Sequence, residues 1–144
     1  MKNFLYALVL LFTLAACKKH SDRPAVWMTM LLNSDTAWTT TNVSTDNQNS
    51  GNVYITGTNS ATNEQISLAI SGFVEGKKAY YIDYRGVGGN ITGNTGTYSK
   101  GSGLLYASTG NIFVTSVTGN TINGSFDLYL PNQHINGFFT AAKN

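Results

Sequence analysis

Cysteine, histidine and proline are all scarce in this chain of 144 residues. Its one cysteine, Cys17, cannot form a disulfide within the molecule, and its two histidines, His20 and His134, stand far apart in the sequence. A structural zinc site usually takes four clustered Cys and His ligands, so we expect no metal site of this kind. Heptads and long amphipathic helical periods are missing too, which argues against a coiled coil or a helical domain.

Charge is scarce as well, since only 11% of the residues are Asp, Glu, Lys or Arg. The nine basic residues include Lys2 in the N-terminal segment; without it, eight basic residues stand against seven acidic ones. A nearly neutral domain lacks the basic surface with which proteins bind nucleic acid. We therefore predict no nucleic-acid partner.

The apolar run at the N-terminus is too short for a transmembrane helix, which needs about 20 residues. Phe4 to Leu14 follows the positive Lys2 and has the length of a signal-peptide core. Ala15 and Ala16, directly before Cys17, resemble the lipobox of bacterial lipoproteins. That resemblance implies that the thiol carries diacylglycerol and that the peptide is cut before it. The alternative is an ordinary secretory signal followed by a chance cysteine.

These features divide the chain into three parts. We predict a lipoprotein signal peptide, helical before cleavage, over residues 1–16, a lipidated polar tether over 17–24 and one domain over 25–144. The membrane is then a partner through the lipid on Cys17. Each buried methylene contributes about 0.8 kcal/mol, so two or three acyl chains would anchor the protein durably. We expect it in the cell envelope, at the outer membrane, with the periplasmic and surface-exposed sides both open.

Threonine and asparagine are abundant, with 18 and 16 residues, beside 15 glycines and only two prolines. This composition favours strands joined by tight turns. We predict an all-β, antiparallel domain of about nine strands, mostly joined by hairpins, that forms a β-sandwich or a flattened barrel. The strands are expected at 25–32, 36–43, 53–58, 65–71, 79–84, 104–107, 112–117, 121–130 and 135–139.

Two segments between these strands are rich in turn-forming residues. We predict a loop over 46–52 and a longer one over Gly86–Gly103, which contains mainly Gly, Asn, Thr and Ser. The longer loop is the candidate for a mobile or functional segment. Two bulky residues, Trp27 and Trp38, are expected in the core.

One sequence word occurs in both of the last strands, as Ile122-Asn123-Gly124-Ser125-Phe126 and Ile135-Asn136-Gly137-Phe138-Phe139. Alternation places the isoleucine, the glycine and the final phenylalanine of each word on one face. The glycine then leaves space for an aromatic ring of a neighbouring strand to lie across it. Two copies are too few to indicate a repeat protein.

Further short stretches carry a family resemblance. They are Asp35-Thr36-Ala37-Trp38-Thr39, Ile55-Thr56-Gly57-Thr58 and Gly110-Asn111-Ile112-Phe113-Val114-Thr115-Ser116. With the lipobox and the first of the two late words, they resemble a family of small all-β outer-membrane-type lipoproteins of unknown function from Gram-negative bacteria. The resemblance covers most of the chain after residue 17, except Gly86–Gly103. It implies an anchored envelope protein and brings no catalytic residues.

The common catalytic and cofactor motifs are not found. Gly86-Val87-Gly88-Gly89 has Ile91 where a dinucleotide fingerprint needs its third glycine, and no helix is expected after it. We predict no cofactor and no catalytic residues. The less favoured alternative is an envelope hydrolase that uses Asp83, Asp127 or His134, which requires these groups to converge on one pocket.

Binding is the function that remains. Tyr54, Tyr81 and Tyr129 alternate with the aliphatic face of their strands, so they are the candidates for an exposed aromatic row. Such a row could stack on sugar rings or pack on a protein partner. Singly scattered surface aromatics are the plainer interpretation. We therefore predict a non-enzymatic module that binds a glycan or an envelope protein, with a carrier of a small apolar ligand in a barrel cavity as the alternative.

Overall fold

The computed structural model describes residues 26–48, 51–82 and 93–143. These residues form eleven strands in two antiparallel sheets and contain no helix, so none that could cross a membrane. The signal peptide, Cys17 and the tether lie outside the described residues. In spatial order the six-stranded sheet comprises β2 (Asp35–Thr40), β1 (Trp27–Leu32), β11 (Gln133–Ala142), β10 (Thr121–Leu130), β9 (Thr109–Thr118) and β6 (Ala79–Tyr81). The five-stranded sheet comprises β3 (Val43–Gln48), β4 (Asn52–Asn59), β5 (Glu64–Ile70), β7 (Thr95–Lys100) and β8 (Gly103–Tyr106).

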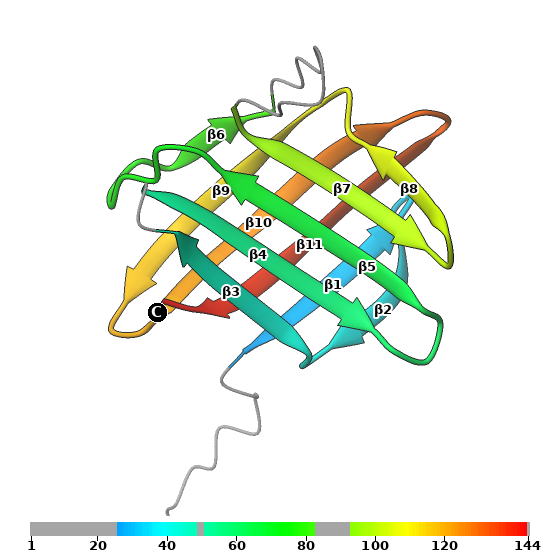
Figure 1. Cartoon of the computed structure of the whole chain (residues 1–144), viewed down its shortest axis with the longest axis horizontal. Helices are drawn as coiled ribbons and strands as arrows, with labels where there is room; N and C mark the ends of the chain where they lie inside the picture. The colour runs from blue at the N-terminus through cyan, green and yellow to red at the C-terminus, as the bar shows by residue number, and fades with distance from the viewer. Residues whose placement is uncertain (1–25, 49–50, 83–92, 144) are drawn as a thin grey trace, which may run out of the picture.

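The two sheets pack face to face, and their strands cross at a steep angle (Figure 1). The chain passes between the sheets after only two residues at the β2–β3 corner and again at the β8–β9 corner. Thr40 Oγ1 donates a hydrogen bond to the carbonyl oxygen of Thr58 at 2.7 Å across the first corner. At the second corner, the Ser108 amide donates to the carbonyl oxygen of Tyr129 at 2.9 Å. The all-β sandwich is thus confirmed, and the closed barrel is not formed.

The core lies between the sheets, where the strands alternate buried and exposed residues. Met28 and Met30 of β1 and Ile55, Ile66 and Leu68 of the five-stranded sheet belong to this core, and all five are fully buried. Burying a side chain of this size contributes about 1.5–3 kcal/mol, so the alternating pattern supplies the main force that holds the sheets together. Trp38 belongs to this core, as expected, with 6% of its surface exposed.

The repeated word of the last two strands produces a reciprocal packing arrangement. In the β10–β11 ladder Gly124 pairs with Phe139, and Phe126 pairs with Gly137. A Cβ atom on Gly124 would lie 2.5 Å from Cζ of Phe139, and one on Gly137 would lie 2.6 Å from Cζ of Phe126. Each phenylalanine therefore occupies the space that the opposite glycine leaves, as the sequence predicted.

The count of about nine strands was wrong by two, and both additional strands are polar. β3 covers part of the predicted 46–52 loop, and β7 lies inside the predicted Gly86–Gly103 loop. Tyr98 is the one large apolar side chain of β7, so the segment shows no alternating pattern of its own. The strand forms because β5 and β8 both pair with it, and its Gly96 leaves room for Leu128 of the opposite sheet. Residues 83–92 of that predicted loop lie outside the described residues.

Candidate binding surface

The outer face of the six-stranded sheet carries several exposed aromatic rings. Because side chains alternate, each strand of this sheet turns every second residue away from the core. Phe138 on β11 is 54% exposed, Phe113 on β9 is 39% exposed, and Tyr81 on β6 is 71% exposed. Trp27 on β1 also lies on this face, because its neighbour Met28 points inward. The Trp27 side chain is half-buried. We call this surface the outer face.

Strand register places these rings along a diagonal. Phe138 pairs with Ser125, and Ser125 pairs with Phe113, so the two phenylalanines are two strands apart at the same level. Two strand spacings correspond to about 10 Å. Trp27 lies one strand beyond Phe138 and two residue pairs further along the ladder, and Tyr81 lies one strand beyond Phe113, two residue pairs along in the opposite direction. The rings therefore cross the sheet at an angle to its strands.

Two grooves adjoin on this face, and both are lined by Phe138 and Ser125. The first groove measures about 440 Å³ and extends to Trp27, Asn123 and Thr140. The second measures about 350 Å³ and extends to Phe113, Asn136 and the pair Asp127 and His134. Both volumes lie within the range typical of small-ligand sites. Phe138 is the ridge between them.

Uncharged polar groups lie between the aromatic rings. In the first groove Thr140 Oγ1 donates to Asn123 Oδ1 at 2.7 Å, and Asn123 Nδ2 donates to Ser116 Oγ at 3.1 Å, which holds the amide in a defined orientation. Next to the second groove, Oδ1 of Asn111 and Oδ1 of Asn136 are buried and accept no hydrogen bond from the described residues. Buried carbonyl groups are usually paired, so these two oxygens are exceptions among the described residues.

Asp127 and His134 meet at the far end of the second groove. His134 Nε2 and Asp127 Oδ1 form a short contact, and both side chains are about one-third exposed, at 32% and 33%. The ring of Tyr129 stacks on the imidazole, with centroids 4.5 Å apart and planes at 13°. The cross-strand pairing of Tyr129 with His134 brings these rings together.

The hydrolase alternative needed Asp83, Asp127 and His134 to converge. Two of them do, whereas Asp83 lies outside the described residues. Within the described ranges, no serine, threonine or cysteine forms a hydrogen bond with the imidazole, and no group of three or more His, Cys, Asp or Glu residues could hold a metal ion. Asp127 and His134 therefore form a polar wall of the second groove.

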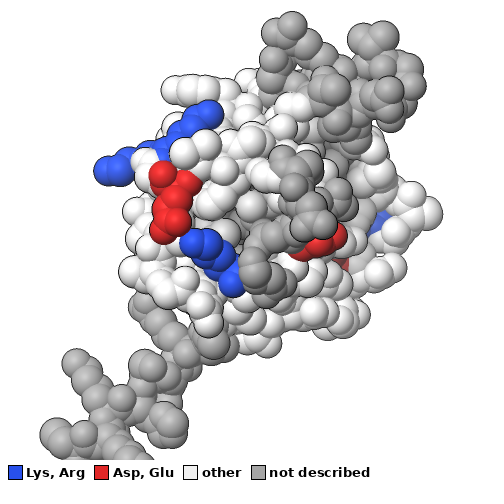
Figure 2. Space-filling model, turned by 60° about the vertical axis from the view of Figure 1, so that its left-hand side comes forward, with Lys and Arg blue, Asp and Glu red and all other residues white. Residues whose placement is uncertain are grey.

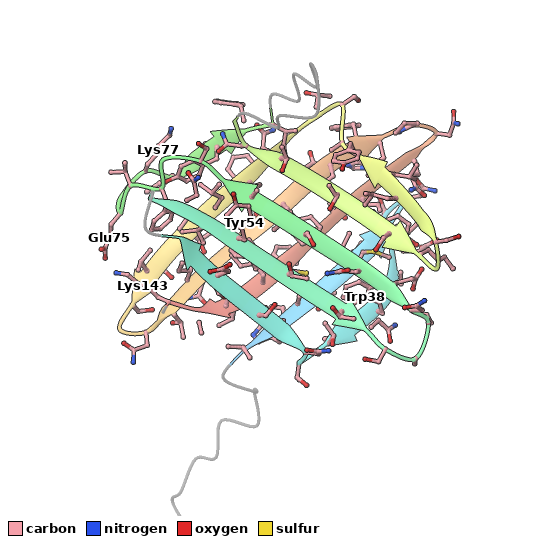
Figure 3. The ribbon with its side chains drawn as sticks, in the orientation of Figure 1. Trp38, Tyr54, Glu75, Lys77 and Lys143 are labelled. Carbon is pink, nitrogen blue, oxygen red and sulfur yellow. The ribbon has the colours of Figure 1, made fainter. Side chains whose placement is uncertain are left out.

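The three tyrosines predicted as a row lie on two opposite faces. Tyr81 and Tyr129 are exposed on the outer face, at 71% and 46%. Tyr54 of β4 is 37% exposed on the other sheet, which faces the viewer in Figure 3. The exposure inferred from alternation is correct for all three, but Tyr54 shares no surface with the others. It has the environment of a singly scattered surface aromatic.

Sequence reasoning missed three residues of the outer face. Trp27 was expected in the core because Ala25 to Leu32 is almost entirely apolar, which hides the phase of alternation. Phe113 and Phe138 alternate with inward residues, Ile112 and Phe139 among them, so their outward orientation could have been read from the period of two.

Charge is nearly absent from the six-stranded sheet. Its strands contain no Lys or Arg, and their only acidic residues are Asp35 and Asp127. Charged side chains of both signs gather instead at one edge of the sandwich, where Glu75 pairs with Lys143 at 3.1 Å and Lys77 lies 4.7 Å from the Tyr80 ring centroid (Figures 2 and 3). The outer face is therefore suited to an uncharged ligand.

Among the described residues, the titratable groups with clearly shifted pKa values lie away from this face, in the five-stranded sheet. Glu64 is 7% exposed and accepts hydrogen bonds from Thr62 and Tyr98 at 2.6 Å and from Lys100 at 3.2 Å. Burial alone would raise the pKa of Glu64, but the hydrogen bonds and the charge of Lys100 together lower it. Burial and the neighbouring carboxylate raise the pKa of Tyr98 above its usual range. Because every oxygen of this cluster is paired, we interpret it as structural.

Comparison with known protein families, curated proteins and solved structures finds no match to this chain.

Proposed function

We propose that this protein is a lipid-anchored cell-envelope protein that binds neutral carbohydrate on its outer face without transforming it. The observation that carries the proposal is the exposed ridge of Phe138 between two grooves lined by aromatic rings and by polar side chains, of which only the Asp127 and His134 pair can carry charge. The anchor rests on the lipobox-like Ala15-Ala16-Cys17 sequence and on the resemblance to outer-membrane-type lipoproteins.

A sugar ring matches both kinds of group on this surface. One face of a pyranose consists of C–H groups that pack on an aromatic ring, and its rim of hydroxyls donates and accepts hydrogen bonds. Phe138 and Trp27 supply aromatic surface, while Asn123, Ser125 and Asn136 supply polar groups beside it. A neutral sugar also needs no counter-charge, in agreement with strands that contain no Lys or Arg.

A protein partner explains the surface less well. Protein interfaces pack at the density of a protein interior, and their centres are closely filled. The centre of this face is instead hollowed by two grooves of about 440 and 350 Å³, each in the size range of a small-ligand site. Carbohydrate therefore fits this surface better than a protein partner does.

The proposal predicts that Phe138→Ala weakens glycan binding at least about tenfold, which corresponds to about 1.4 kcal/mol. The ring is exposed and lines both grooves, so its removal takes away contact surface at the centre of the site. The measurement is retention of the purified protein on an array of neutral glycans, followed by titration of each retained glycan. Tyr54→Ala removes an exposed ring of the opposite sheet and should leave retention unchanged.

Two results would contradict the proposal. One is that the wild-type protein retains no glycan at about 1 mM, and the other is that both variants weaken retention equally. Recovery of one envelope protein by crosslinkers placed next to Phe138, with no glycan retained, would assign the outer face to a protein partner instead.

A further inference from the structure

We infer that the ligand is an internal stretch of an extended, neutral sugar chain that crosses the six-stranded sheet diagonally over Trp27, Phe138 and Phe113. This inference rests on the proposed function and specifies the ligand class. It distinguishes a polysaccharide chain from a single sugar or a chain end.

The spacing of the rings is the first argument. Phe138 and Phe113 are separated by two strand spacings, about 10 Å, with the small Ser125 between them. That span exceeds one sugar ring and is close to the length of two linked rings. One chain can therefore stack alternate sugar units on the two phenylalanines, while the unit between them lies over Ser125.

The continuity of the grooves is the second argument. Both share Phe138 and Ser125, so a ligand that leaves one groove over this ridge enters the other. Each groove lies open on the sheet surface, and together they extend from Trp27 to the Asp127 and His134 pair. A site for a chain end or a single sugar would be expected to enclose its ligand more fully.

The polar groups follow the same path, which is the third argument. Asn123, held by Thr140 and Ser116, lines the first groove, and Asn136 lines the second. Hydrogen-bonding groups thus lie on both sides of the Phe138 ridge. Each groove can bind hydroxyls of a different sugar unit.

The test compares chain lengths with the detergent-solubilised, full-length protein. β-1,4-Linked glucan, mannan and xylan oligosaccharides are titrated as disaccharides and as hexasaccharides by calorimetry, because these linkages give extended chains. We expect a hexasaccharide to bind at least about tenfold more tightly than the matching disaccharide. The Trp27→Ala and Phe113→Ala variants should each reduce this gain, whereas Phe138→Ala should weaken both lengths.

Thermal unfolding of each variant checks that it is folded. Trp27→Phe is the matched control, because it keeps an aromatic ring and should retain most of the dependence of affinity on chain length. Equal affinity for disaccharide and hexasaccharide would overturn the inference and leave carbohydrate binding intact. Retention on the glycan array of only single sugars, branched sugars or chain ends would do the same. If the array retains no glycan, the proposed function fails as well.

Discussion

Among single residues, Glu64 has a lowered pKa that its neighbours explain. Its two carboxylate oxygens accept hydrogen bonds from Thr62, Tyr98 and Lys100 while the residue is 7% exposed. Since its pKa in the folded chain is below the ordinary value of 4.5, the unfolded chain binds the proton more readily. The stability that this group contributes is therefore complete above about pH 4.5 and is lost as the pH falls through its lowered pKa.

We expect Glu64→Gln to lower the free energy of unfolding at neutral pH by about 1–3 kcal/mol, because it weakens hydrogen bonds to a charged, buried group. The difference from wild type should shrink as the pH falls below about 4.5, where the carboxylate of the wild type also becomes protonated. Urea unfolding at a series of pH values measures both effects. Glu75→Gln is the matched control, because that side chain is 63% exposed and surface ion pairs contribute little. A difference that stays constant with pH would contradict this account.

Among the elements, the β1–β2 hairpin depends on a strained turn. Its two central residues, Asn33 and Ser34, have φ values of 50° and 76°, in the left-handed region that a tight hairpin turn requires. The Asn33 amide also donates to the carbonyl oxygen of His134 at 2.9 Å, which joins this turn to β11. Asparagine tolerates this conformation, whereas serine has no such preference.

Ser34→Gly should therefore stabilise the protein by about 0.5–1 kcal/mol, because glycine adopts positive φ without steric cost. Denaturant unfolding monitored by tryptophan fluorescence measures the change. Ser60→Gly, at an exposed turn position without positive φ, should instead lower stability slightly through the greater freedom of the unfolded chain. Equal shifts for the two variants would show that the backbone conformation of the turn is not the cause.

For the whole molecule, the proposed anchor and the outer face lie close together in the chain. Trp27 follows Cys17 by ten residue steps, and at about 3.4 Å per step the segment can span at most about 35 Å. A lipid on Cys17 would therefore keep the Trp27 end of the outer face within about that distance of the membrane. The proposed function thus places the binding surface close to the membrane.

Replacing Cys17 by serine should move the protein from the membrane fraction to the soluble fraction, because the thiol is the proposed site of lipid attachment. Cell fractionation measures the distribution, and mass spectrometry of the N-terminal peptide measures the acylation. Ser21→Ala, in the same predicted tether, should remain in the membrane fraction. Soluble wild-type protein with an unmodified Cys17 would refute the anchor and leave the argument for the outer face intact.

The sequence by itself determined the class of fold and the orientation of most strand side chains. Alternation is a local property of extended backbone, so the inward positions of Ile122, Phe126 and Phe139 and the outward positions of Tyr54 and Tyr81 followed from the period of two. The glycine and phenylalanine pairing of the last hairpin followed in the same way, because a short turn brings those two strands side by side.

Only the tertiary structure decided which outward residues share a surface. Alternation shows whether a side chain points away from the core, but it does not show which sheet the side chain belongs to. Tyr54 and Tyr81 therefore lie on different sheets, whereas Trp27, Phe138 and Phe113 share the outer face. β7 likewise is a strand because of its neighbours, since Thr95–Lys100 carries no apolar pattern of its own. The physical reason is that a period of two is a local property, whereas pairings such as β1 with β11 and β5 with β7 join segments that lie far apart in the chain.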